Sequence, residues 1–349
     1  MTHHTTHIHP VRRSPLALTV LAVLAVCAGP AAAQSNVTIF GVLDIGVQRI
    51  SGGNKSLKLQ SIDGLQTSRL GFRGSEDMGG GLRAGFHLEG AIAPDTGGGF
   101  DFRRRSTVSI SKDGIGELRL GRDYTPTFWN ISRFNAFGTN GVGAASNLIY
   151  GFDGLSGSAK TVVRSDNAVG YFLPSGLGGV YGQAMLAAGE GSTGKYAGLR
   201  VGYAAGPVDV AASVSDTDNN VAGDKFRVSS VGGTFDAGVA KLFGLVHNSK
   251  QTTREQNNWV VGANMPLGQA ILRASYTHAH LTNSATNADY TGKQLALGGI
   301  YNLSKRTALY STWSRVQNSS TGKFVIAGAP AITAGQGSSA VEAGVYHAF

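Results

Sequence analysis

Apolar and polar residues alternate with a period of two through most of the chain after residue 34. In 37–48 (VTIFGVLDIGVQ) the odd positions hold Val, Ile, Gly, Leu, Ile and Val, and the even ones include Thr, Asp and Gln. The pattern recurs at 82–89, where Leu, Ala, Phe and Leu alternate with Arg, Gly, His and Glu. Because successive side chains of a strand point to opposite faces, this alternation predicts β-strands with one apolar face.

Sixteen segments of this kind follow one another along the chain. They lie at 37–49, 67–75, 82–92, 102–111, 116–122, 161–173, 178–188, 194–204, 206–216, 224–235, 240–249, 257–265, 269–278, 292–302, 306–316 and 339–349. Short connections follow the even-numbered segments. Longer ones follow the odd-numbered segments, at 50–66, 93–101, 123–160, 217–223, 250–256, 279–291 and 317–338. Tight turns at one end and long loops at the other are typical of a transmembrane barrel.

A soluble sandwich gives the same alternation, but it has no reason to keep all its long loops at one end. The mature chain contains no apolar run of about eighteen residues, so no transmembrane helix is predicted. Backbone groups in lipid must all be paired, and a closed barrel is the only β-structure that achieves this. The sequence therefore predicts an all-β, sixteen-stranded antiparallel transmembrane barrel over residues 34–349.

The first 33 residues have the pattern of a cleaved secretory signal peptide. Arg12 and Arg13 supply its positive end, 16–28 (LALTVLAVLAVCA) is an apolar core too short to span a bilayer, and 31–33 (AAA) is a small-residue cleavage site. The signal predicts that the protein leaves the cytoplasm.

Composition narrows the function classes. Charged residues make up 15% of the chain, and there are 51 Gly against 9 Pro, which favours many strands and turns. Cys27, the single cysteine, is lost with the leader, which excludes a disulfide scaffold and a thiolate metal site. We expect no cofactor and no metal. The formal charge of +9 falls to +7 without the leader, but no basic helix can be drawn, so nucleic acid is not an expected partner.

The connection 123–160 is far longer than ordinary connections of about six residues, and such a loop is usually functional. It is rich in aromatic residues, and its charged residues are Asp123, Arg133, Asp153 and Lys160. Its aromatic residues, among them Tyr124, are expected to pack it against the barrel wall. We expect this loop to fold into the barrel and to narrow it.

Four segments resemble the general porins of Gram-negative outer membranes, especially those of β-proteobacteria. They are VTIFGVLDIGVQ at the mature start, SRLGFRGSEDMGGGLRAGFHLEG at 68–90, GELRLGRDYTP at 116–126 and the ending VYHAF. The resemblance implies an outer-membrane location, a homotrimer and a third extracellular loop that folds inward, which by position is 123–160. It also implies outer-membrane lipid and lipopolysaccharide as surroundings.

The resemblance also implies a basic wall facing this constriction loop. Its arginines correspond to Arg69, Arg105 and Arg164, by the motif in which each lies. Counting by twos independently puts Arg69, Arg105, Arg73, Arg83 and Arg119 on the lumen face. A solvated strand face, or local pairing with Glu117 and Asp166, would explain the same residues without a pore. The loop lacks the Pro-Glu-Phe-Gly segment of cation-preferring members.

The C-terminal Phe349 falls at an outward position of the last segment, where an aromatic residue suits the edge of a membrane.

These patterns predict a water-filled diffusion channel for small hydrophilic solutes and ions that prefers anions. A porin specific for carboxylate or phosphate solutes is the second hypothesis, and a structural or adhesin barrel is the third. An enzyme is not expected, because neither Ser275 with His278 nor Ser339 with His347 has a convincing third partner.

Overall fold

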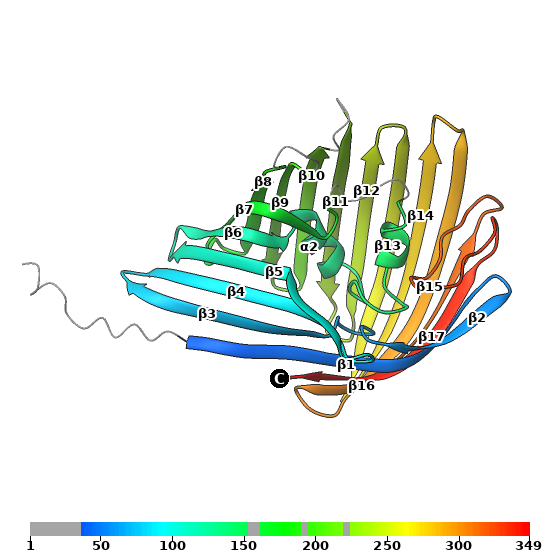
Figure 1. The fold of residues 1–349 in the computed structure, drawn as a ribbon, viewed down its shortest axis with the longest axis horizontal. Helices are drawn as coiled ribbons and strands as arrows, with labels where there is room; N and C mark the ends of the chain where they lie inside the picture. The colour runs from blue at the N-terminus through cyan, green and yellow to red at the C-terminus, as the bar shows by residue number, and fades with distance from the viewer. Residues whose placement is uncertain (1–35, 153–160, 190–193, 219–223) are drawn as a thin grey trace, which may run out of the picture.

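A computed structural model describes residues 36–152, 161–189, 194–218 and 224–349. The predicted signal peptide, Asp153 and Lys160 therefore lie outside the described residues. Antiparallel strands follow one another around a closed wall, and the first strand pairs with the last from Val42 opposite Ala348 to Gly52 opposite Ser338 (Figure 1). The predicted all-β barrel is confirmed.

Seventeen strand segments of the described chain build the wall. They are β1 (Asn36–Gly52), β2 (Lys55–Ser61), β3 (Arg69–Gly79), β4 (Leu82–Ala93), β5 (Gly98–Lys112), β6 (Gly116–Tyr124), β7 (Arg164–Phe172), β8 (Val180–Ala187), β9 (Tyr196–Ala205), β10 (Val208–Asp218), β11 (Lys225–Asp236), β12 (Lys241–Gln251), β13 (Arg254–Leu267), β14 (Ala270–Asn283), β15 (Ala288–Asn302), β16 (Thr307–Asn318) and β17 (Ser338–Ala348). β2 and β3 pair with successive parts of β1, so together they form one interrupted strand of a sixteen-stranded barrel.

The two faces of the wall differ as the alternation predicts. In β10, Val208, Val210 and Val214 are exposed on the outer face. Asp209, Ser213 and other polar residues between them are buried on the inner face. Apolar residues outward and polar residues inward suit a wall between lipid and an aqueous interior. Phe349 continues the outward row of β17, is 46% exposed, and exchanges backbone hydrogen bonds with Gly41.

The prediction of a long connection at 50–66 is wrong. β1 runs on to Gly52, the chain turns at 53–54, and β2 returns along β1. The side chains of β2 are exposed on both faces up to Gln60. The alternation in β2 is limited to Leu57 and Leu59 on either side of Lys58, which is too short a pattern to distinguish a strand from a loop. In the structure, the connections predicted at 93–101, 250–256 and 279–291 are also shorter than predicted, because the strands on both sides extend into them.

Residues 62–68, between β2 and β3, leave the wall and fold over the inner face of β1. The buried Asp44 carboxylate accepts hydrogen bonds from the backbone N–H groups of Gly64 (3.3 Å), Leu65 (2.7 Å) and Gln66 (2.8 Å). The Tyr310 hydroxyl on β16 donates to the same carboxylate at 2.7 Å. One side chain therefore holds an inner ledge, which we define as residues 62–68.

Asp44→Ala should lower the free energy of unfolding by about 3 kcal/mol, because three backbone donors, one of them buried and two partly buried, lose their acceptor together. Urea unfolding of the barrel in detergent, followed by tryptophan fluorescence, measures the loss. Tyr310→Phe removes one of the same hydrogen bonds and should cost only about 1 kcal/mol. Equal losses in the two variants would show that Asp44 does not organise the ledge.

Candidate functional site

The connection from β6 to β7 carries two short helices, α2 (Pro126–Arg133) and α3 (Ser146–Ile149). α2 begins at Thr125, whose hydroxyl accepts a hydrogen bond from the Phe128 N–H, and Pro126 suits the first helical turn because it lacks an N–H group. Asp123 and Tyr124 still belong to β6 and pair with β7, so the connection begins two residues later than predicted.

The segment 125–152 contacts the buried, polar face of strands that follow it in the chain. The Asn130 amide donates to the Ala211 carbonyl (3.2 Å) and to the Ser230 hydroxyl (3.1 Å). Gly232 lets the Phe134 ring approach the backbone of β11, because a Cβ there would lie 2.5 Å from the ring. Figure 1 shows α2 beside β10 and β11, with which it is in contact.

Farther along, the same segment reaches the last strands of the barrel. The Gln256 side chain donates to the Leu148 carbonyl at 2.9 Å, and the Gln294 side chain donates to the Val142 carbonyl at 3.0 Å. The Val142 N–H donates to the Glu342 carboxylate at 3.1 Å. In this part of the segment, strand side chains bind backbone groups and fix the course of the chain.

The ledge contacts this segment from the other side. The Thr67 hydroxyl donates to the Asn140 side chain at 3.0 Å. A Cβ on Gly141 would lie 2.3 Å from the Gly64 carbonyl, so only glycine fits at this approach. The segment 125–152 is therefore supported by the wall and by the ledge.

The strands β3 to β7, which directly precede the strands in contact with α2, carry a group of arginines around two carboxylates. Glu89 accepts from Arg104 at 2.6 Å and lies 3.8 Å from the Arg69 guanidinium. Asp123 accepts from Arg119 at 2.6 Å and lies 3.4 Å from the Arg105 Nε. Glu89 and Asp123 are almost completely buried, which strengthens their attraction to the arginines.

Arg164 joins this group through Tyr124. Its guanidinium lies over the Tyr124 ring at 4.4 Å and donates to the Tyr124 hydroxyl at 2.8 Å. Arg104 donates to the same hydroxyl at 2.8 Å. The Tyr124 ring stacks on Phe128 with ring centroids 4.8 Å apart, so the arginine group is in contact with α2.

Arginines outnumber carboxylates in this group. We define the arginine cluster as the side chains of Arg69, Arg104, Arg105, Arg119 and Arg164. The carboxylates that contact it in the described chain are Glu89, Asp123 and Glu117. A guanidinium is always charged in proteins, so the cluster keeps an excess of positive charge.

The other predicted wall residues lie apart from the cluster on the same face of the sheet. Arg73 packs over the Phe40 ring at 5.1 Å. Arg83 forms an exposed ion pair with Asp113 at 2.8 Å near the short turns. A concave surface of about 360 Å³ includes Arg73, Arg83, Arg105 and His87, with Glu117 as its carboxylate.

A second charged group lies at the other end of α2. Arg133 of α2 forms an ion pair with Asp209, which also accepts from the Tyr181 hydroxyl at 2.6 Å. Arg200 donates to the Asn130 side chain at 2.6 Å and lies 4.8 Å from the Tyr181 ring. Arg133, one of the charged residues predicted on the connection, therefore forms an ion pair with the wall.

Sequence reasoning missed Arg104 and Glu89. Counting by twos places Arg104 on the outer face, because its neighbour Arg105 points inward. Register shifts between Glu89 and Ala91 form a β-bulge in the pairing of β4 with β5, and a bulge re-aims a side chain. Arg104 consequently turns to Glu89, which no period-two pattern shows.

No helix among the described residues is long and apolar enough to cross a membrane. Nor do those residues contain a group of three or more His, Cys, Asp or Glu side chains that could hold a metal ion.

Comparison with known proteins places this arrangement in a family. A family model described as Gram-negative porin matches residues 17–321. "Outer membrane porin protein 32" of Delftia acidovorans is 34% identical over 97% of this chain and 100% of its own length. The chain belongs to the Gram-negative porin family. It is an outer-membrane porin, as its sequence predicted.

Two further relatives agree. An outer-membrane porin protein of Bordetella pertussis is 27% identical over 86% of this chain and 94% of its own length. The solved structure titled "Anion-selective porin from Comamonas acidovorans" has a TM-score of 0.82 and 32% identity, and covers 90% of this chain and 100% of its own.

Asn130→Ala should loosen α2 of this porin, because the Asn130 side chain is buried and bridges Arg200, β10 and β11. We expect hydrogen exchange in 126–133 to become at least about tenfold faster, the equivalent of one or two lost hydrogen bonds. Mass spectrometry of deuterated peptides measures it.

Gln256→Ala provides the matched control, since the Gln256 side chain donates to the carbonyl groups of α3 and to the Asn258 side chain. Its effect should be confined to 146–152. Unchanged exchange at α2 in Asn130→Ala would refute the anchoring role of that side chain.

Proposed function

We propose that this porin is a diffusion channel that prefers anions, and that 125–152 is its constriction loop. The proposal rests on the arginine cluster, in which five guanidinium groups lie close to only three carboxylates next to α2. An ion in a narrow passage loses part of its hydration shell and meets fixed charges at short range. An excess of positive charge there raises the local concentration of anions.

The magnitude of the electrostatic term supports this proposal. A unit charge pair at 4 Å is worth about 1 kcal/mol in bulk water and about 4 kcal/mol at an effective dielectric of 20. Even the lower figure changes the ratio of anion to cation occupancy several-fold. The selectivity named for the Comamonas acidovorans porin, a relative with 32% identity, supports the same sign.

Arg164→Gln and Arg105→Gln should each lower the ratio of chloride to potassium permeability about threefold or more, because each removes one positive charge beside the proposed constriction. Reversal potentials across planar bilayers in a KCl gradient measure the ratio. Arg83→Gln removes an exposed, paired arginine at the short-turn end and should change the ratio little.

High salt should reduce the preference in the wild-type channel without closing it, because screening shortens the reach of the fixed charges. A wild-type reversal potential of cation-selective sign would refute the anion preference and leave the family assignment intact.

A substrate-specific porin for carboxylate or phosphate solutes is the second candidate. The concave surface lined by Arg73, Arg83, Arg105 and His87 favours it, because guanidinium groups bind such oxyanions bidentately. The structural or adhesin alternative has no comparable feature, and a conducting barrel would exclude a purely structural role. A channel without enzymatic activity follows from both candidates.

Inorganic phosphate should transiently block the chloride current in the substrate-specific case, with a half-blocking concentration that rises at least about threefold in Arg73→Gln. Single-channel recording with phosphate, and with an uncharged solute of similar size as the control, measures the block. Current that falls equally with both solutes would leave only general diffusion.

We further propose that the porin assembles as a homotrimer. The outer faces of β1, β5 and β6 support this, since they expose Val37, Ile39, Val108, Ile110 and Leu118. These residues would suit either lipid or a neighbouring subunit.

A further inference from the structure

Two aromatic side chains of the segment 125–152 are not packed against the wall. The four phenylalanines of this segment are buried, namely Phe128, Phe134, Phe137 and Phe152. Trp129, in contrast, is only partly buried, and Tyr150 is 37% exposed. Because the buried side of the segment lies against the inner face of the wall, its exposed side faces the interior of the barrel. Exposed aromatic surface beside a few charged groups is typical of a binding site for small organic molecules.

Trp129 lies on the less buried side of α2. It shares this side with Ser132 and Arg133, since residues at i, i+3 and i+4 of a helix are neighbours on its surface. The centroid of the Trp129 ring lies 5.4 Å from that of Tyr124 and 5.9 Å from that of Phe128. The three rings therefore form one aromatic group, which is in contact with the arginine cluster through Tyr124.

Tyr124 has no free ring face within this group. The Arg164 guanidinium lies over the Tyr124 ring at 4.4 Å, and the Phe128 ring stacks on Tyr124 at an interplanar angle of 17°. Two groups that both lie over one ring must occupy its opposite faces. A further aromatic ring that enters beside Arg164 would therefore contact Trp129 and not the face of Tyr124.

Arg164 is the member of the arginine cluster that has no carboxylate partner among the described residues. Its Nε donates to the Arg104 carbonyl at 2.6 Å and its Nη2 donates to the Tyr124 hydroxyl at 2.8 Å. A guanidinium has five N–H groups, so both terminal nitrogens keep N–H groups for a ligand. Stacking on Tyr124 uses the face of the guanidinium and leaves its edge, which binds carboxylates bidentately.

Tyr150 brings a second exposed ring to the same region. It directly follows α3 and lies within electrostatic range of Arg164 and Tyr124. Aromatic side chains from both helical parts of the segment therefore lie near the one cluster arginine that lacks a carboxylate partner in the described chain.

We propose that Arg164, Trp129 and Tyr150 form a binding site for aromatic carboxylates, with the carboxylate on Arg164 and the ring against Trp129 and Tyr150. The inference rests on the proposed function, because passing solutes meet this site only if 125–152 narrows the channel. The site is separate from the concave surface that includes Arg73 and Arg83, to which no residue of 125–152 contributes.

The chemistry of the site distinguishes three classes of solute. A small aliphatic carboxylate pairs with Arg164 but leaves the aromatic surface in water. An uncharged aromatic molecule covers that surface but leaves the guanidinium edge unpaired. An aromatic carboxylate does both, so the apolar contact and the charge-assisted hydrogen bonds act together.

The first test compares solutes on the wild-type porin. Benzoate, acetate and benzamide are each added to single channels that conduct chloride, and the concentration that halves the current is measured. The half-blocking concentration of benzoate should be about tenfold lower than that of acetate, which lacks the ring, and of benzamide, which lacks the charge. This comparison needs no variant and does not depend on the folding of one.

The second test uses variants that form conducting channels. Trp129→Leu should raise the half-blocking concentration of benzoate about fivefold, because it removes the aromatic face, and Trp129→Phe should raise it less than twofold. Arg164→Gln should raise it about tenfold, because the carboxylate loses its charged partner.

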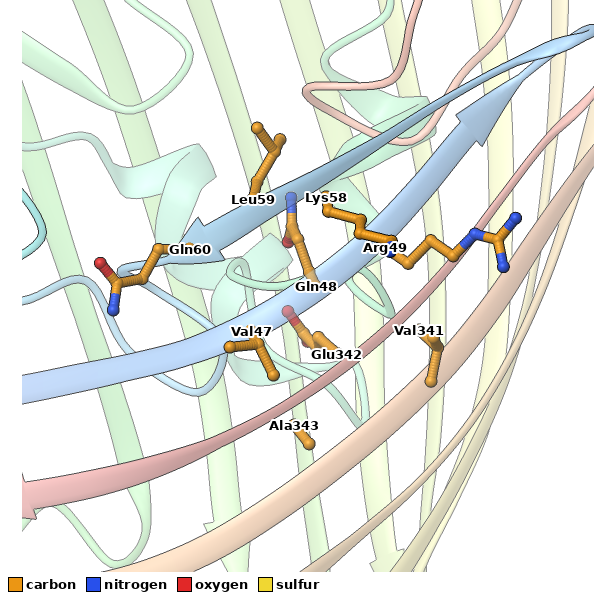
Figure 2. Close-up of a pocket in the computed structure, with 9 residues that line it drawn as sticks. All are labelled: Val47, Gln48, Arg49, Lys58, Leu59, Gln60, Val341, Glu342 and Ala343. Carbon is orange, nitrogen blue, oxygen red and sulfur yellow. The ribbon is translucent and has the colours of Figure 1, made fainter.

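Two exposed residues of the outer face provide matched controls. Trp259→Leu removes a tryptophan of β13 that is 42% exposed. Arg49→Gln removes an arginine of β1 that lies opposite Lys58 in the register of β1 and β2 (Figure 2). Arg49 shares its face with Val47, which is 67% exposed, and so points away from the channel. Both variants should change the half-blocking concentration of benzoate less than twofold.

Three results would overturn the proposal. The first is equal block of the wild type by benzoate and acetate. The second is an equal effect of Trp129→Leu and Trp259→Leu. The third is a loss in Trp129→Phe as large as in Trp129→Leu, which would assign Trp129 to packing alone.

The reversal potential in a KCl gradient without benzoate separates this proposal from the proposed function. An anion-selective potential together with equal block by benzoate and acetate would overturn the aromatic carboxylate site alone. A cation-selective potential with block by benzoate that depends on Trp129 would overturn the anion preference and support the site.

Discussion

The pairing of backbone hydrogen-bonding groups is the constraint on which the rest of this porin depends. A strand edge exposed to lipid would leave N–H and C=O groups without partners, so the wall has to close, and β1 pairs with β17 along most of its length. Closure divides every strand into an outer and an inner face. The outer face must be apolar, and polar and charged side chains are therefore concentrated in the interior.

A polar interior makes a folded-in segment possible. The segment 125–152 has few charges of its own, and its backbone is held by Gln256, Gln294 and Glu342 of the wall. The ledge at 62–68 supports it from the opposite side through Asn140 and Gly141. Interrupting the second wall strand costs several ladder hydrogen bonds, and the hydrogen bonds to Asp44 offset part of that loss.

The charged groups of the arginine cluster are held by partners. Inside, each cluster arginine has a hydrogen-bonding or ionic partner, so the excess charge is held rigidly in place.

The sequence by itself determined the barrel and its strand number, because alternation along a strand is a local property. It did not locate the hairpin of β1 and β2, because the alternation in β2 is limited to Leu57 and Leu59. Only the tertiary structure decided that Arg104 turns inward at a bulge, that Glu89 gathers two arginines and that 62–68 forms a ledge on Asp44. These features depend on register shifts and on contacts between strands far apart in the chain, and a period-two pattern carries no information about either.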